Sequence, residues 1–172
     1  INHSADHDET DARTTLDELR ARFEWPYFYP EQNCLVAVLP DGTLAGYTTA
    51  ELDPRIGRGW GRGCVDPAYR RRGIGRALIR AADTRHLDRS KTEMAPDLPL
   101  SVTRHCRDTN SSLRALLESE GYAIARVSWI MRTELGDPVE VPPLPDGIAL
   151  RPVERERAAN AVWQAEQEFF RD

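Results

Sequence analysis

The residues best suited to chemistry lie in one short segment, residues 65–78, with the sequence VDPAYRRRGIGRAL. Its apolar start indicates the end of a strand, and Gly73 and Gly75 follow where a helix should begin. The first backbone N–H groups of a helix have no partner within the helix. Glycine lets a ligand approach these groups, and the helix dipole favours negative charge there. The segment therefore predicts a phosphate-binding site.

Four arginines around the two glycines can add charge-assisted contacts to an anion: Arg70, Arg71, Arg72 and Arg76. A solvated arginine run at a helix start is the structural alternative, and a Gly-x-Gly alone favours it. Two known phosphate loops do not fit the segment. No Gly-Lys-Ser/Thr follows, and Leu78 stands where a dinucleotide fingerprint has its third glycine. The remaining pattern is Arg-x-x-Gly-x-Gly.

The patterns before this segment predict one helix and a β-hairpin. Thr15 and Glu18 have the spacing of a capping box, which predicts a helix over about residues 15–24. An Asp-Gly turn joins two strand-like runs over residues 34–39 and 44–52. These runs therefore form a hairpin.

The remaining periodicities predict alternating strands and helices. In order, these are an irregular strand, a helix, a strand, a helix and a long or bent strand, over residues 60–65, 73–87, 98–106, 110–120 and 122–135. The order α-β-β-β-α-β-α-β predicts an α/β (α+β) fold, a mixed sheet covered by helices. The phosphate-binding segment then lies between a strand and the helix that follows it.

The Arg-x-x-Gly-x-Gly pattern resembles the pyrophosphate-binding signature of the Gcn5-related N-acetyltransferase (GNAT) family, including an upstream Val-x-Pro and a downstream leucine. Asn110-x-x-Leu113 and Gly121-Tyr122 fall where the second helix of that family and its stop are expected. The resemblance covers most of residues 16–135. It implies a GNAT-like mixed, mostly antiparallel sheet flanked by helices, with splayed central strands.

The resemblance also implies an acetyl-CoA site at the start of the predicted helix. Backbone amides would bind the pyrophosphate, and the pantetheine arm would lie between the bulged strand and the strand ending near Cys106. Asn110 would contact the arm or order its loop, and its alternative role is a helix cap. The expected cofactor-binding residues are Cys64, Val65, Arg70, Arg71, Arg72, Gly73, Ile74, Gly75, Arg76 and Asn110. Acetyl-CoA is the expected acyl donor, and no metal is expected.

The activity implied by the resemblance is transfer of an acetyl group from acetyl-CoA to a primary amine of a small molecule. The catalytic acid and base stay unassigned, because Leu117 occupies the position that often carries the tyrosine acid of the family. Leu117 and Tyr122 are interpreted as core residues. Glu51 and Asp53 could reach the cleft, but they are interpreted as a solvated strand end. The alternative function is a catalytically silent acyl-CoA-binding domain that supports a neighbour.

A proline-rich segment, residues 136–147, predicts a linker that divides the chain. Residues 1–135 then form a GNAT domain that lacks its usual first strand and helix. Residues 148–172 predict the first strand, over 148–153, and the first helix of a second GNAT domain, similar to mycothiol synthase and related two-domain acetyltransferases. This segment either belongs to a neighbour in a longer protein or completes the first sheet, and burial of apolar area favours completion.

Composition limits the class of protein. A chain of 172 residues with 40% hydrophobic content can bury one sizeable core. The net charge of −5 argues against general nucleic-acid binding. The sequence contains neither a membrane-length apolar run nor a signal pattern, and its three cysteines form no C-x-x-C pair. A cytoplasmic protein is expected, with no nucleic-acid or membrane partner.

Overall fold

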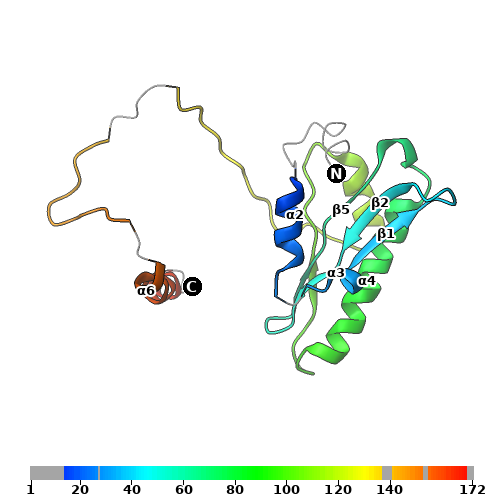
Figure 1. Ribbon diagram of the computed structural model, residues 1–172, viewed down its shortest axis with the longest axis horizontal. Helices are drawn as coiled ribbons and strands as arrows, with labels where there is room; N and C mark the ends of the chain where they lie inside the picture. Colours follow the sequence, from blue (N-terminus) through cyan, green and yellow to red (C-terminus); the bar gives the residue numbers. More distant parts are fainter. Residues whose placement is uncertain (1–13, 27, 137–140, 153–154, 170–172) are drawn as a thin grey trace. The chain divides into compact units, whose positions relative to one another are not determined.

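The structure is a computed structural model that describes residues 14–26, 28–136, 141–152 and 155–169 (Figure 1). The chain divides into two compact units, Ile1–Arg126 and Val127–Asp172. The first unit contains the strands and all but one of the described helices. It also contains the predicted phosphate-binding segment.

The first described helix, α2 (Leu16–Phe23), begins at the predicted capping box. The Thr15 hydroxyl accepts a hydrogen bond from the Glu18 amide at 3.2 Å, and the Glu18 carboxylate accepts one from the Thr15 amide at 2.7 Å. Two of the otherwise unpaired amides at the helix start are satisfied in this way. A short helix, α3 (Pro30–Asn33), was not predicted and leads into the sheet.

The predicted hairpin is confirmed as an antiparallel pair, β1 (Cys34–Val38) and β2 (Leu44–Thr49). Its turn has Gly42 at a φ of 87°, a left-handed conformation that glycine adopts without strain. The Asp41 carboxylate accepts a hydrogen bond from the Thr43 amide at 2.9 Å. Turn chemistry read from the sequence therefore locates this hairpin correctly.

The second and third strand runs are both broken in the middle. β2 is followed by β3 (Glu51–Asp53) after a break at Ala50, and β4 (Arg58–Trp60) is separated from β5 (Gly63–Val65) by residues 61–62. β2 pairs with β5, and β3 pairs with β4, both antiparallel. The two runs are thus one long hairpin whose ladder is interrupted on both strands. The predicted irregularity at Gly61 and Gly63 appears as this interruption.

The interruption separates the central strands. β6 (Ser101–Thr103) pairs in parallel with β4, with Trp60 opposite Thr103. β5 pairs with β2 and, within the described chain, with no strand on its other side. The strand predicted over residues 98–106 is therefore shorter, and β5 is left unpaired on the side where splaying was expected.

The long helix α4 (Ile74–Glu93) packs against β1, β2, β3 and β5 and extends six residues beyond its predicted end. Figure 1 shows α4 along one face of the strands, with α2 on the other side of them. The buried apolar residues of α4 are Leu78, Ile79 and Ala82, whereas Ala81 is exposed. Helix α5 (Ser111–Ser119) follows β6 as predicted.

Two buried polar residues continue the inward face of α4, and periodicity did not reveal them. The His86 Nε2 lies 3.0 Å from the Glu51 carbonyl oxygen and 3.3 Å from that of Trp60. Arg89 donates to the Ala50 carbonyl at 3.2 Å and to the Glu93 carboxylate at 2.8 Å. The Ala50 carbonyl lies in the break after β2, and Glu51 and Trp60 face each other in the β3–β4 ladder beside it. The helix therefore adds side-chain hydrogen bonds to main-chain oxygens next to the interruption.

Two predicted strands are absent from the described residues. Residues 123–136 are extended but form no strand, and Trp129 is 85% exposed. Residues 148–152 also form no strand, and residue 153 lies outside the described chain. A strand needs a hydrogen-bonded neighbour, and neither segment has one among the described residues. Completion of the first sheet by residues 148–153 stays a prediction.

The second unit contains one described helix, α6 (Arg155–Phe169). It confirms the predicted amphipathic helix, although Phe169 is 78% exposed. Burial of this ring was expected if the segment completed the first sheet. The assignment of residues 148–172 to a second domain stays a prediction.

Burial lowers the pKa of the His86 imidazole, so we predict that acid destabilises the fold. The neutral ring donates through Nε2, and protonation would place a charge in the core near Arg104, with the Asp83 carboxylate 4.0 Å away. Because the pKa is lower in the folded state than in the unfolded state, the unfolded state binds more protons. The free energy of unfolding should therefore fall as pH drops below about 6.5, the usual histidine value.

Urea unfolding between neutral and mildly acidic pH measures this effect. His86→Gln retains an N–H donor without the titration, so its free energy of unfolding should depend less on pH over that range. His105→Gln is the matched control, because His105 is exposed and should leave the dependence unchanged. Equal pH dependence in the parent and in His86→Gln would contradict the prediction.

Candidate functional site

The predicted phosphate-binding loop is fastened to the end of β5. Asp66 caps a short 3-10 helix, η1 (Pro67–Tyr69), by accepting a hydrogen bond from the Ala68 amide at 2.8 Å. The Arg70 Nε donates to the Val65 carbonyl at 3.1 Å. Arg70 thus ties the loop back to the strand from which it leaves.

The loop then turns twice through left-handed backbone conformations. Arg71 has a φ of 64° and Gly73 has a φ of 82°. A non-glycine residue in this region is strained by about 1–2 kcal/mol, and such strain concentrates at functional sites. Left-handed residues beside right-handed ones turn successive N–H groups toward one concave side, which suits an anion. The sequence did not reveal the conformation of Arg71.

The amides of this loop are available to a ligand. Gly73 is the N-cap of α4, and the first backbone bond there runs from the Ala77 amide to the Gly73 carbonyl at 3.0 Å. Within the described chain, the amides of residues 71–76 make no hydrogen bond. This set of unpaired donors at the start of a 20-residue helix fits a phosphate or pyrophosphate group.

The two glycines of the motif serve different purposes. A Cβ added at Gly73 would meet no atom within 4 Å, so this position needs glycine for its left-handed backbone and keeps the space above the loop open. A Cβ added at Gly75 would lie 3.3 Å from Leu116 Cδ2 and 3.8 Å from Val65 Cγ2. Gly75 therefore lets α5 and β5 pack closely against the start of α4.

The arginines of the motif are not equivalent. Arg72 lies over the Tyr69 ring at 5.3 Å and donates to the Ala68 carbonyl at 3.3 Å. Arg76 pairs with the Glu120 carboxylate at 2.8 Å, at the end of α5. Arg71 is exposed and has no polar side-chain contact within the described chain. Of the four predicted arginines, Arg71 is the one whose side chain makes no polar contact with the described residues.

Glu120 connects the start of α4 to the end of α5. Arg80 also pairs with this carboxylate, at 2.6 Å, and its hydrogen bond lowers the pKa of Glu120. Arg76 adds a hydrogen bond to the Ser119 hydroxyl at 3.0 Å. The predicted contact between Arg76 and the ligand phosphate would have to compete with this pairing.

The two predicted strand residues of the site, Cys64 and Val65, are half-buried on β5. Cys64 lies opposite Tyr47 on β2, and burial raises the pKa of Tyr47 to about 12, so its phenol is neutral at physiological pH. The far edge of β5 lacks a strand partner among the described residues. Cys106 is exposed and lies beyond the end of β6, which stops at Thr103.

Asn110 acts as a helix cap. Its side-chain oxygen accepts a hydrogen bond from the Leu113 amide at 3.0 Å, which starts α5. This confirms the structural alternative for Asn110. The side chain is half-buried, and its contact with a pantetheine arm stays a prediction.

Helix α5 supplies no tyrosine acid. Leu117 is 7% exposed and is a core residue, as predicted. The Tyr122 hydroxyl donates to the Asp83 carboxylate at 2.7 Å and accepts from the Arg104 Nε at 2.9 Å. Burial raises the pKa of Tyr122, and its hydroxyl is already committed to this network.

The interpretation of Glu51 as part of a solvated strand end is wrong. Glu51 is 3% exposed, because its carboxylate accepts hydrogen bonds from the Trp60 Nε1 at 2.6 Å and from the Thr49 hydroxyl at 2.9 Å. Asp53 is half-buried and pairs with Arg55 at 2.7 Å. Glu51 pairs with Trp60 across the two strands because residues 54–57 form the turn that joins β3 to β4. The sequence analysis did not predict this turn.

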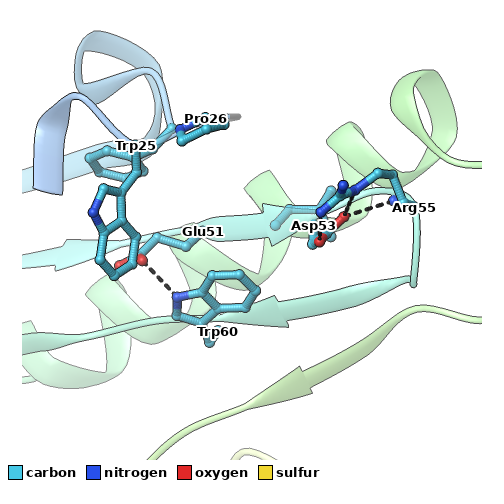
Figure 2. A pocket seen from close by; sticks show the side chains of 8 residues that line it. Trp25, Pro26, Glu51, Asp53, Arg55 and Trp60 are labelled. Carbon is cyan, nitrogen blue, oxygen red and sulfur yellow. Dashed lines mark hydrogen bonds and ion pairs between the residues drawn. The ribbon is translucent and has the colours of Figure 1, made fainter. Parts of the chain in front are cut away.

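Glu51 lines a pocket of about 190 Å³. Figure 2 shows the Glu51 side chain beside the Trp25 ring, with its hydrogen bond to Trp60. The pocket is formed by the segment after α2 and by strands β3 and β4, and its lining residues are Trp25, Pro26, Phe28, Glu51, Leu52, Asp53, Arg55 and Trp60.

Two other classes of site were considered for the residues that the structure describes. They include no group of three or more His, Cys, Asp or Glu side chains arranged to hold a metal ion. None of the described helices is long and apolar enough to cross a bilayer.

The fold and the amide-lined helix start belong to a known class of acyltransferase. Residues 3–122 match the Acetyltransferase (GNAT) family, which is more than half of the chain. The chain therefore belongs to the GNAT family, and its mixed, mostly antiparallel strands and flanking helices are the GNAT fold.

Curated relatives within this family are mycothiol acetyltransferases. The chain is 40% identical to the one from Salinispora arenicola over 112 residues, which is 64% of this chain and 32% of the relative. It is 38% identical to the one from Salinispora tropica over 132 residues, which is 76% of this chain and 38% of the relative. The chain thus spans about a third of the length of these relatives.

Solved structures show the same fold. A GCN5-related N-acetyltransferase from Sphaerobacter thermophilus superposes with a TM-score of 0.78 and 23% identity, over 98% of this chain and 52% of that one. A GNAT-family acetyltransferase from Streptococcus pneumoniae superposes with a TM-score of 0.54 and 16% identity, over 78% and 84% of the two chains.

Because Leu117 is buried, replacing it with tyrosine should destabilise the domain rather than restore an acid. Overpacking a well-packed core costs about 1–3 kcal/mol, so Leu117→Tyr should lower the free energy of unfolding by that amount. Ala115→Tyr on the exposed side of the same helix is the control and should change stability by less than about 0.5 kcal/mol. Equal stability of the two variants in urea would show that position 117 is not packed as described.

Proposed function

We propose that this chain binds acetyl-CoA at the start of α4 and transfers its acetyl group to a primary amine of a small molecule. The observation that carries the proposal is the set of unpaired amides over residues 71–76, at the N-terminus of a long helix. Family membership supports acetyl-CoA as the acyl donor. Both point to the same loop.

The residues proposed to hold acetyl-CoA have separate tasks. The amides from Arg71 to Arg76 would bind the pyrophosphate, and the charge of Arg71 would add to them. The unpaired edge of β5 at Cys64 and Val65 would lie along the pantetheine arm. Asn110 would contribute through its side-chain nitrogen, since its oxygen caps α5.

The proposed reaction forms a C–N bond and breaks the C–S bond of the thioester. The ammonium of the acceptor must first lose a proton to a base, and the departing thiolate takes up a proton. The protein contributes by holding both reactants together and by directing backbone amides at the developing charge on the carbonyl oxygen. No described side chain is assigned as the base or the acid at this stage.

A second candidate function is a silent acyl-CoA-binding domain that supports a neighbour. Two observations favour this alternative. Leu117, at the position of the family's tyrosine acid, has no proton to donate, and the Tyr122 hydroxyl already donates its proton to Asp83. The amide-lined loop fits both functions. They differ in turnover and not in binding.

The whole protein is proposed to contain a second GNAT domain. The proline-rich stretch after residue 135, the helix α6 and the greater length of the curated relatives support this proposal. The names of these relatives support a small-molecule acceptor. A cytoplasmic site of action fits the free cysteines and the use of acetyl-CoA.

Thiol release from acetyl-CoA, measured against a panel of primary amines, tests the proposed transfer. Turnover that depends on one class of amine would support the enzyme. Acetyl-CoA binding without turnover on any amine, by this chain and by the full-length protein, would favour the silent domain. Absence of acetyl-CoA binding would contradict both.

We predict that Gly73→Val weakens acetyl-CoA binding by at least about tenfold, or about 1.4 kcal/mol. A branched side chain opposes the φ of 82° and projects into the open space above the amides. Gly73→Asn should be milder, because asparagine tolerates this conformation. Calorimetry with acetyl-CoA measures the dissociation constants.

Gly42→Val is the control for this prediction. Gly42 has a similar φ of 87° and the same open surroundings, but it lies in the hairpin turn. It should lower stability without changing affinity. Tight binding by folded Gly73→Val would overturn the site assignment.

A further inference from the structure

Among the described residues that line the Glu51 pocket, one carboxylate has no counter-ion. Its ionisable lining residues are Glu51, Asp53 and Arg55. Arg55 forms a two-pronged contact with Asp53, at 3.0 Å and 2.7 Å, which neutralises that pair. Two carboxylates and one guanidinium leave a net charge of −1, and the charge that remains is that of Glu51.

The partners of Glu51 are neutral. Each carboxylate oxygen accepts a hydrogen bond, one from the Thr49 hydroxyl and one from the Trp60 indole. Within the described chain, no Arg, Lys or His side chain forms an ion pair with Glu51. His86 contacts only the main-chain oxygen of Glu51.

Such an arrangement is costly unless a ligand uses it. Burying a charge without a counter-ion costs several kcal/mol, so proteins pair buried carboxylates or place them at functional sites. Glu51 is 3% exposed, yet it lines a pocket that holds space for a small group. The missing counter-ion can therefore come from a ligand.

The walls of the pocket suit a cation. Trp25 and Trp60 present indole rings beside Glu51 (Figure 2), and the buried Phe28 also lines the pocket. Indole is the aromatic side chain that attracts cations most strongly. A carboxylate and two indoles together favour an ammonium group over a neutral group of the same shape.

We propose that this pocket binds a compact ammonium group, with the Glu51 carboxylate as its counter-ion and the indoles of Trp25 and Trp60 as its walls. That this ammonium belongs to the acceptor of the acetyl group rests on the proposed function. The cation site itself does not depend on that function. The acceptor class would then be an amine that enters in its protonated form.

Two probes of the same shape test the site without any substitution in the pocket: n-butylammonium and n-butanol, at constant ionic strength. Tryptophan fluorescence reports on Trp25 and Trp60. Replacing the exposed Trp129 and Trp163 by phenylalanine removes the other two signals. We expect saturable binding of n-butylammonium that is at least about tenfold tighter than that of n-butanol. Equal affinities, or no saturable binding of n-butylammonium, would overturn the proposal.

Glu51→Gln should reduce n-butylammonium affinity at least about tenfold and leave n-butanol affinity unchanged. Asp53→Asn is the matched control, because it changes the net charge of the pocket by the same amount and leaves the Glu51 contact in place. Its affinity for n-butylammonium should change less than that of Glu51→Gln. A folded Glu51→Gln variant that binds n-butylammonium as the parent does would overturn the proposal. If Glu51→Gln does not fold, the comparison of the two probes on the parent still decides.

Calorimetry with acetyl-CoA separates this proposal from the proposed function. Glu51→Gln should bind acetyl-CoA as the parent does, because Glu51 lies outside the amide loop. If the parent does not bind acetyl-CoA, the proposed function is wrong, whereas the proposed cation site is unaffected. If the parent binds acetyl-CoA but does not prefer n-butylammonium to n-butanol, the cation site is wrong and the proposed function is unaffected.

Discussion

Hydrogen bonds from helix α4 to the interrupted hairpin fix the position of this helix, on which the rest of the domain depends. The Ala50 carbonyl lies in the break between β2 and β3, beside the paired residues Glu51 and Trp60, and His86 and Arg89 of α4 lie within hydrogen-bonding distance of these three carbonyls. An unpaired buried carbonyl costs about 1–3 kcal/mol, so α4 cannot shift along the sheet without losing these contacts. Because the middle of α4 is fixed in this way, its first turn is held beside the end of β5.

The loop before α4 depends on that placement. Gly75 packs against Val65 and Leu116, and Glu120 holds Arg76 and Arg80. These contacts fix the first turn from three sides while its amides stay open. The positive φ of Arg71 is strain that such a rigid surrounding can maintain. A site built from backbone amides needs this support, since its donors cannot adjust by changing rotamers.

The sequence predicts the parts of the fold that local chemistry determines. The capping box at Thr15, the turn at Gly42 and the helix start at Gly73 were all located correctly. It does not predict the features that depend on distant partners. The burial of His86, Arg89 and Glu51 follows from the interrupted ladder, and a hydrophobic periodicity cannot show polar residues turned inward. The strands predicted over residues 122–135 and 148–153 had suitable patterns but lack neighbours among the described residues.

The interruption also relates the two proposed sites to one hairpin. Its β2–β5 half leads into the amide loop at Asp66, and its β3–β4 half carries Glu51 and Trp60 into the pocket. A continuous ladder would use every main-chain group along the strands and would leave β5 paired like its neighbours. Breaking the ladder frees the edge of β5 on one side of Gly61 and sets the carboxylate of Glu51 on the other. The hydrogen bonds from α4 to the carbonyls beside the break therefore connect both proposed sites to the same helix.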